Sequence, residues 1–402
     1  MFFNLKNHTF EVNFNKITSL SKDLKFLFSV VILLLFIARG ESQIHRDTLF
    51  KRISYDLDFR FRIEQDWNSR TSNGSFRENR SRLRYRMRAG MKYTHDWYSF
   101  GYRIRTGDPR KQQDPQLTVG TAFEEFGTLP LGFEKVYFKG EWDKWSFWLG
   151  KNDFPFAKNN ELFWSDNVFP EGVFASRKWT FESSVLQDIR LSGGHFILSA
   201  SGRDFGSDAY VQGLQTKANF WNERLQIFPS YYRMKNIADI PDGAKTFTLD
   251  YQILHLGGKW KVLEKQNLAC KFDIYTNVQD YSDHEFLNDS FKDEKLGIVV
   301  GIKKGQLSKK NDHLFELTYA YLERYSALDY MAQNDWARWD YSAFDSPDGR
   351  LTNLQGVEFV YGYAISKKMN IVFKAYQVDQ LVALGVSKEN GSRVRLDLNV
   401  KL

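Results

Sequence analysis

Residues 53–64 read ISYDLDFRFRIE, and large apolar side chains alternate with polar ones along the whole stretch. The apolar set is Ile53, Tyr55, Leu57, Phe59, Phe61 and Ile63, and the polar set is Ser54, Asp56, Asp58, Arg60, Arg62 and Glu64. Successive side chains of a β-strand point to opposite faces, whereas a helix would scatter both sets around its circumference. The stretch therefore predicts a long strand with one apolar face and one charged face.

The same alternation recurs to the end of the chain, for instance over residues 80–93 and 393–402. It predicts about sixteen strands, within a range of about 14–18. The expected strands cover residues 52–64, 79–94, 97–106, 132–141, 144–151, 176–184, 187–202, 207–219, 223–235, 246–261, 267–281, 292–304, 312–325, 353–365, 369–379 and 391–402.

Alternation by itself also fits a soluble antiparallel sandwich with one wet face. The expected strands are longer than the five or six residues of an average soluble strand, and they are long enough to cross a bilayer at a tilt. Short and long connections alternate, and Trp97, Trp142 and Trp221 lie at short ones, where a membrane boundary would place them. We therefore expect an all-β fold, a closed antiparallel transmembrane β-barrel with short periplasmic turns and long outer loops.

A cleaved signal peptide is expected over residues 1–42. The apolar stretch 26–38 is too short to span a membrane comfortably, and it follows Lys22 and Lys25 and precedes small residues. Cleavage near 40–42 would leave residues 43–402 as one barrel domain in a bacterial outer membrane. The alternative is an uncleaved N-terminal anchor. A polytopic helical membrane protein is excluded because 26% of the residues are charged.

Arginines on the polar faces of three early strands are expected to line the lumen. They are Arg60, Arg62, Arg80, Arg82, Arg84, Arg86, Arg88, Arg103 and Arg105. Facing lipid, each would cost about 2–4 kcal/mol at the middle of the bilayer. One interpretation is a basic wall that attracts small polar or anionic solutes. The other is structural, with the arginines paired to acids such as Asp56, Asp58 and Glu64, and both stay open.

The long link 152–175 is the expected constriction loop. Its acidic candidates are Asp153, Glu161, Asp166 and Glu171, and its phenylalanine, tryptophan and proline residues would let it pack inside the barrel. The alternative is an outward surface loop. Two other long links are acidic as well, 107–131 through Glu124 and Glu125, and 326–352 through Asp329, Asp335, Asp340, Asp345 and Asp348.

The stretch from Gly150 to Phe156 reads GKNDFPF and continues through NNELFW at 159–164 to Pro170-Glu171-Gly172. Together with the Arg-x-Arg-x-Arg strand, it resembles an uncharacterised porin family of Gram-negative bacteria. The resemblance covers essentially the whole mature chain. It implies a barrel and a channel, and it carries no assigned catalytic residues and no known substrate.

We therefore predict a passive porin-like channel for small polar solutes, with no catalytic residues, metal or cofactor. Its partners would be outer-membrane lipid and the barrel-assembly machinery, which would read the C-terminal strand even though that strand ends in Leu402 rather than an aromatic residue. A homotrimer is left open, and no nucleic-acid motif is present. One alternative is a barrel enzyme acting at its rim, for which His195 with Ser192 or Ser199 is the weak candidate. The other is an adhesin or structural barrel that binds through its long loops.

Overall fold

The computed structural model describes residues 52–113, 115–120, 127–204, 206–239, 247–337 and 351–402. The expected signal peptide, residues 1–42, lies outside this part of the chain, and so do Glu124, Glu125, Asp340, Asp345 and Asp348. The chain divides into two units, Met1–Ile53 and Ser54–Leu402, and the second unit is the barrel.

One antiparallel sheet contains every strand of the described residues. Its sixteen long strands are β1 (Ile53–Arg70), β2 (Arg80–His95), β3 (Tyr98–Thr106), β5 (Leu131–Trp142), β6 (Trp145–Lys151), β7 (Glu171–Thr180), β8 (Leu186–Ser199), β9 (Ala209–Phe220), β10 (Leu225–Ala238), β11 (Thr248–Leu263), β12 (Leu268–Asn277), β13 (Leu296–Gly305), β14 (His313–Leu322), β15 (Leu354–Ser366), β16 (Met369–Gln380) and β17 (Asn390–Lys401). The two-residue strand β4 (Leu117–Thr118) pairs with β2 in the loop that follows β3.

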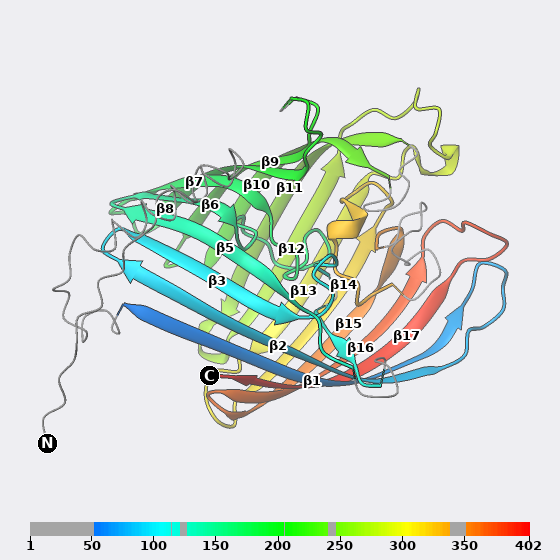
Figure 1. Cartoon of the computed structure of the whole chain (residues 1–402), viewed down its shortest axis with the longest axis horizontal. Helices are drawn as coiled ribbons and strands as arrows, with labels where there is room; N and C mark the ends of the chain where they lie inside the picture. Colours follow the sequence, from blue (N-terminus) through cyan, green and yellow to red (C-terminus); the bar gives the residue numbers. More distant parts are fainter. Residues whose placement is uncertain (1–51, 114, 121–126, 205, 240–246, 338–350) are drawn as a thin grey trace, which may run out of the picture. The chain divides into compact units, whose positions relative to one another are not determined.

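The sheet closes into a barrel because the last strand pairs with the first. Phe59 of β1 lies opposite Val400 of β17, and Phe61 lies opposite Leu398. β1 also pairs with β2, and each later long strand pairs with the next one along the chain, so that the wall follows the order of the sequence (Figure 1). The predicted closed all-β barrel of about sixteen strands is therefore confirmed.

Short turns and long loops alternate around the barrel, and the long loops gather at one end, to the right in Figure 1. The turns 96–97, 143–144 and 367–368 have two residues each. Asp96 and Asp143 have φ angles of 42° and 48°, a left-handed conformation that aspartate tolerates in hairpin turns. The 3₁₀-helix η2 (Glu264–Gln266) lies in a short turn, and η3 (Asp289–Phe291) and η4 (Asp329–Met331) lie in long loops. Among the described residues, no helix is long and apolar enough to cross a membrane.

The two faces of the wall differ as the alternation predicts. On β1, Phe59 and Ile63 are 41% and 49% exposed on the outside, whereas Arg62 and Glu64 are 4% and 1% exposed. The large side chains of the other strands are likewise exposed on the outer face, and Trp142 near the short turns is half exposed. An apolar outer surface thus surrounds a charged and largely buried interior.

Several predicted strand boundaries are wrong, and the two largest differences are at the start of β7 and the end of β1. β7 begins at Glu171, five residues before the predicted start at 176, because Glu171 and Gly172 already pair with Lys151 and Gly150 of β6. The loop that precedes β7 is therefore 152–170. β1 continues past 64 to Arg70, because its polar end still pairs with β17, as in the register of Asp66 with Arg393. Neither extension carries an alternating pattern that would reveal it.

Candidate functional site

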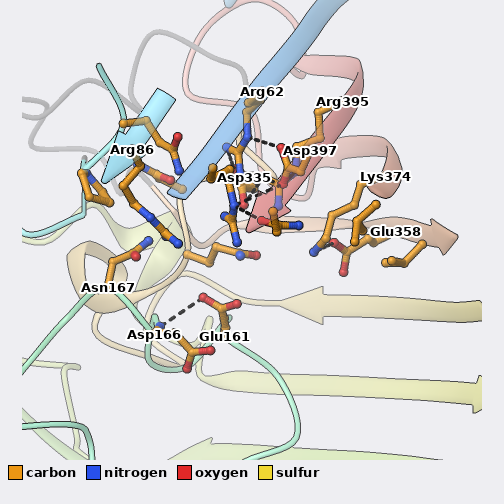
Figure 2. Close-up of a pocket in the computed structure, with 18 of the residues that line it drawn as sticks. Arg62, Arg86, Glu161, Asp166, Asn167, Asp335, Glu358, Lys374, Arg395 and Asp397 are labelled. Carbon is orange, nitrogen blue, oxygen red and sulfur yellow. Dashed lines mark hydrogen bonds and ion pairs between the residues drawn. The ribbon is translucent and has the colours of Figure 1, made fainter. Parts of the chain in front are cut away.

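A cavity of about 570 Å³ lies in the lumen, between the inner faces of β1, β2 and β14–β17 on one side and two loops on the other, with Gln113, Pro115 and Gln116 of the loop after β3 also in its lining. We name residues 152–170 the first inner loop and residues 323–337 the second inner loop. Asp58, Arg60, Arg86 and Arg395 come from the wall, and Glu161 and Asp335 come from the two loops. Figure 2 shows several of these side chains pointing into the same space.

The first inner loop packs its aromatic side chains against the inside of the barrel. Phe163 is 2% exposed, and its ring stacks on Tyr275 of β12 with 4.8 Å between the ring centroids. Phe156 packs edge-on against Tyr232 of β10 at 5.5 Å. Gly213 of β9 lies under the Phe156 ring, where a Cβ atom would come within 2.5 Å of it. At the level of this loop, the half of the lumen beside β6–β12 is therefore filled, and the cavity lies in the opposite half.

Polar contacts fix the same loop. The Asn160 amide donates to the Asp273 carboxylate at 2.7 Å. The backbone N–H of Ala157 donates to the Gln215 side chain at 2.7 Å, and the Gln215 amide donates back to the Ala157 carbonyl at 3.0 Å. Because buried polar groups held at both donor and acceptor sites resist displacement, the loop is anchored rather than loosely inserted.

The second inner loop is bonded to the first. The backbone N–H of Ser165 donates to the Met331 carbonyl at 2.8 Å, and that of Gln333 donates to the Glu161 carbonyl at 2.9 Å. Trp336 is 1% exposed and packs edge-on against Tyr376 of β16, with 5.8 Å between the ring centroids. The two loops therefore narrow the lumen together.

Asp335 joins the second inner loop to the strands that close the barrel. Its carboxylate lies 2.5 Å from Arg395, 3.7 Å from Arg62 and 3.9 Å from Arg393, and Figure 2 shows it beside Arg62 and Arg395. Burial by itself would raise the pKa of Asp335, but the attraction of Arg395, Arg62 and Arg393 outweighs it and holds the pKa well below the ordinary value. Asp335 is therefore ionised throughout the physiological range.

The nine arginines predicted from the sequence fall into two groups. Arg60, Arg62, Arg84, Arg86 and Arg88 line the cavity. Arg80, Arg82, Arg103 and Arg105 lie outside its lining. Most of the nine are paired with carboxylates: Arg62 with Asp397 at 2.6 Å, Arg80 with Asp66 at 2.7 Å, Arg88 and Arg103 with Glu134 at 2.6 Å each, Arg82 with Glu64, and Arg86 with Asp58. Arg105 donates to the backbone carbonyls of Asp108 and Lys111 in the loop that follows β3.

This pairing bears on the two interpretations of the arginine strand. A guanidinium held by a buried carboxylate contributes little net charge to the lumen, because the field of the pair is largely that of a dipole. The structural interpretation, in which the arginines stiffen the wall, therefore has direct support from these contacts. Selectivity for anions stays a prediction.

Two of the four acidic candidates for the constriction line the cavity, and two do not. Glu161 and Asp166 line the cavity on the side opposite the arginines, as Figure 2 shows. Asp153 and Glu171 do not line it, and they form exposed pairs with Lys135 at 2.9 Å and with Lys151 at 2.5 Å. Burial, followed by repulsion from Asp166, raises the pKa of the Glu161 carboxyl above its ordinary value.

Several cavity residues were not predicted. Arg395 and Asp397 on β17 lie beside the arginines of β1, and Lys374 of β16 pairs with Glu358 of β15 at 2.8 Å. Their strand parity marks all four as inward-facing. Pairing of the last strand with the first, which any closed barrel requires, would have placed Arg395 and Asp397 at the site.

Ser230, His255 and Asp273 form a buried chain of contacts on β10–β12. The Ser230 hydroxyl lies 3.2 Å from His255 Nδ1, and His255 Nε2 lies 2.9 Å from the Asp273 carboxylate. These residue types in this order resemble a hydrolase triad. Phe163 stacks over His255, however, and all three residues are buried beneath the first inner loop. The contacts therefore anchor the loop and leave no room for a substrate.

The candidate pair of His195 with Ser192 is not assembled. His195 lies three residues from Ser192 on β8, so the two side chains point to opposite faces of the strand. His195 instead contacts Gln212 at 3.1 Å. In the described residues, no group of three or more histidine, cysteine, aspartate or glutamate side chains could hold a metal ion.

Comparison with solved structures finds similar barrels. The structure of Pseudomonas putida OprB matches with a TM-score of 0.53 at 11% identity, over 89% of this chain and 96% of that chain. A mutant Rh. blastica porin matches with a TM-score of 0.49 at 10% identity, over 87% of this chain and 100% of that chain. At such identities the likeness to OprB shows the fold alone. No family model and no curated protein matches the chain, so its resemblance to the uncharacterised porin family stays a prediction.

Proposed function

We propose that this chain is a porin-like channel of a bacterial outer membrane, through which small polar solutes diffuse passively. The observation that carries the proposal is the closed barrel with a polar cavity of about 570 Å³ in its lumen. A space of that size, lined by charges and amides, suits hydrated solutes the size of an amino acid or a monosaccharide.

The membrane assignment is supported by the outer surface. Large apolar side chains such as Phe59, Leu256 and Phe359 are exposed around the wall and would face water in a soluble protein. Trp97, Trp142 and Trp221 are exposed at the short turns, where indole rings settle at the boundary of a bilayer. Export through the signal peptide 1–42 and assembly through the last strand belong to the same proposal.

The arrangement of charge supports a preference for polar over apolar solutes. Arginines of β1 and β2 lie on one side of the cavity, and Glu161 and Asp166 lie across from them. Oriented charges on opposite sides create a field across the cavity, which favours solutes that can align their own dipoles. Because most arginines are paired, we expect only a modest preference for anions at this point.

Swelling of liposomes that contain the refolded full-length chain tests the proposal. Liposomes with the protein should take up neutral and charged monosaccharides and amino acids faster than empty liposomes. The triple variant Arg82→Gln, Arg84→Gln, Arg86→Gln should change the ratio of anion to cation uptake. Arg110→Gln, which removes an exposed arginine outside the cavity, is the matched control. Uptake no faster than in empty liposomes would contradict the channel, and an unchanged ratio would contradict the role of the arginines.

The two alternatives make different predictions. An adhesin or structural barrel would leave solute uptake at the level of empty liposomes while the folded protein is present. A barrel enzyme would need an accessible catalytic set, and the set that the described residues contain lies buried beneath the first inner loop. The burial of this set counts against the enzyme, and the uptake measurement separates the channel from the adhesin.

A further inference from the structure

Seven cationic side chains lie on the inner wall near the short turns, away from the cavity described above. They are Lys178, Arg190, Lys217, Lys259, Lys261, Lys271 and Lys303, and we name them the basic belt. Their inward direction follows from strand parity, since residues two apart share a face. Lys217 follows Gln215, which bonds to the first inner loop, and Lys271 precedes Asp273, which bonds to Asn160 of the same loop.

Like charges face one another directly within the belt. Lys178 of β7 lies opposite Arg190 of β8, and Arg190 lies opposite Lys217 of β9. Lys259 of β11 lies opposite Lys271 of β12 in the same way. Like charges in register across neighbouring strands destabilise a sheet. The fold therefore gains nothing from these pairings.

The two parts of the belt also act on each other. Lys271, Lys303 and Lys217 all repel the Lys259 ammonium group, and Arg190 and Lys178 repel that of Lys217. The repulsion joins positions on β7–β9 to positions on β11–β13, so the seven residues form one region of positive potential.

Few carboxylates offset this charge. Asp188 lies 3.3 Å from Lys178, Glu316 lies 2.5 Å from Lys271, and Glu223 lies 4.0 Å from Lys261. Within the part of the chain that the structure describes, the remaining four form no ion pair: Arg190, Lys217, Lys259 and Lys303. Glu223 and Asp188 also attract Lys217, and Glu316 attracts Lys303. These three carboxylates face seven cations, so the belt keeps a net positive charge, whereas the arginines beside the cavity are mostly paired.

The spacing of the belt suits an anion with several charged oxygens. Neighbouring strands lie about 4.7–4.9 Å apart, so two ammonium groups on adjacent strands can both donate to one tetrahedral oxyanion. A halide ion has no separate oxygens to offer the two donors. Multiple charge on the ligand also increases the attraction to several cations at once.

We propose that the basic belt is a binding site for small multivalent oxyanions, such as inorganic phosphate. The proposal rests on the proposed channel, because the lumen is the route by which such an ion reaches the belt. None of the seven belt residues lines the cavity described above, so the belt is a separate site along the permeation path. An anion that passes the cavity would be held there before leaving at the short-turn end.

Binding of inorganic phosphate to the refolded full-length chain in detergent tests the proposal without any need for conduction. The broadening of the phosphorus NMR signal of phosphate gives the affinity at low ionic strength. The test variant is Lys217→Gln, Lys259→Gln, Lys271→Gln. The matched control is Lys304→Gln, Lys309→Gln, Lys310→Gln, which removes the same charge from exposed positions at the same end of the barrel. Lysine-to-arginine replacements at the three belt positions keep the charge and check folding.

The native chain, the control and the arginine variant should bind phosphate alike. The glutamine belt variant should bind it at least about tenfold more weakly, because three positive charges near the ion are gone. Native protein that does not bind phosphate, or a belt variant that binds as the native chain does, would overturn the proposal. Liposome swelling judges the channel separately, so absence of solute uptake with intact phosphate binding would contradict the proposed function and not the belt.

Discussion

The carboxylate of Asp335 lies 2.5 Å from the guanidinium of Arg395 and ties a loop to the last strand of the barrel. Arg62 of the first strand lies 3.7 Å from the same carboxylate. Asp335 therefore holds the second inner loop at the seam where the first and last strands meet. Asp335 adds an ionic contact with the wall to the backbone bonds that join the two inner loops and to the packing of Trp336 on Tyr376.

Replacement of Asp335 by asparagine should release the second inner loop from the wall. The neutral amide keeps the size of the side chain but leaves three arginines without their shared counter-charge, which in a buried site costs roughly 3–5 kcal/mol. We expect a larger and noisier single-channel conductance, measured in planar bilayers. Asp289→Asn, at an exposed loop position, is the control. A conductance equal to that of the native chain would show that Asp335 does not hold the loop.

The selectivity of the channel should change with pH through Glu161. Its pKa is raised above the ordinary value of 4.5 by burial and then by Asp166, so it takes up a proton at a higher pH than an exposed glutamate. Because folding favours the neutral acid, this contribution to stability is present at low pH and is lost as pH rises through the raised pKa. Acidification removes a negative charge from the cavity and should shift selectivity toward anions.

The zero-current potential in a salt gradient, measured against pH, checks this prediction. The native chain should show a transition with a midpoint above 4.5. Glu161→Gln should remove the transition, and Asp153→Asn, an exposed acid outside the cavity, should leave it in place. Asp335 should not contribute, since its pKa lies well below the ordinary value and its pairs persist as pH falls. A transition that survives in Glu161→Gln would assign it to another group.

Much of the barrel could be predicted because the alternation of apolar and polar residues reveals the two faces of each strand. Neighbouring side chains of a strand point to opposite faces, which places Phe59 on the outer face and Arg60 on the inner face. The contacts of Asp335 could not be predicted, because the sequence of a loop has no periodicity. Its partners also lie on strands that are far away in the sequence. The pairing of Arg62 with Asp397 could not be predicted either, because it depends on the register between the first and last strands.

The first inner loop was predicted to be the constriction from its aromatic content, and the structure does pack Phe163 inside the barrel. Which of its acids reach the cavity was beyond the sequence. Glu161 and Asp153 belong to the same loop and the same residue class, but the turn of the backbone directs only Glu161 toward the cavity. The composition of a loop indicates that it can pack inside the barrel. The path of its backbone decides which of its side chains line the cavity.

Replacement of Phe163 by alanine should loosen the first inner loop. The ring is fully buried and stacks on Tyr275, so its removal should lower the free energy of unfolding by about 3–5 kcal/mol. Urea denaturation of the refolded barrel, followed by tryptophan fluorescence, measures the loss. Phe286→Ala, at an exposed aromatic position, should have a small effect. Equal losses for the two variants would mean that the loop is not packed as described.

Glu64 should be important for stability rather than for permeation. Its carboxylate is 1% exposed, pairs with Arg82 and lies 3.9 Å from both Arg62 and Arg84. Glu64→Gln removes the buried carboxylate that pairs with Arg82 and attracts Arg62 and Arg84, and we expect a loss of about 3–5 kcal/mol in the same urea assay. Glu141→Gln, which breaks an exposed pair with Lys139, should cost less than about 1 kcal/mol. A small loss for Glu64→Gln would indicate that water already compensates the arginines.

The central claim is that the lumen conducts, and the single-channel conductance of the refolded full-length chain in a planar bilayer tests it most directly. Circular dichroism of the same sample would establish that the β-structure is present. Discrete current steps in symmetrical potassium chloride, with a zero-current potential displaced toward anions in a salt gradient, are the predicted result. Folded protein that inserts into the bilayer and gives no current steps would contradict the claim.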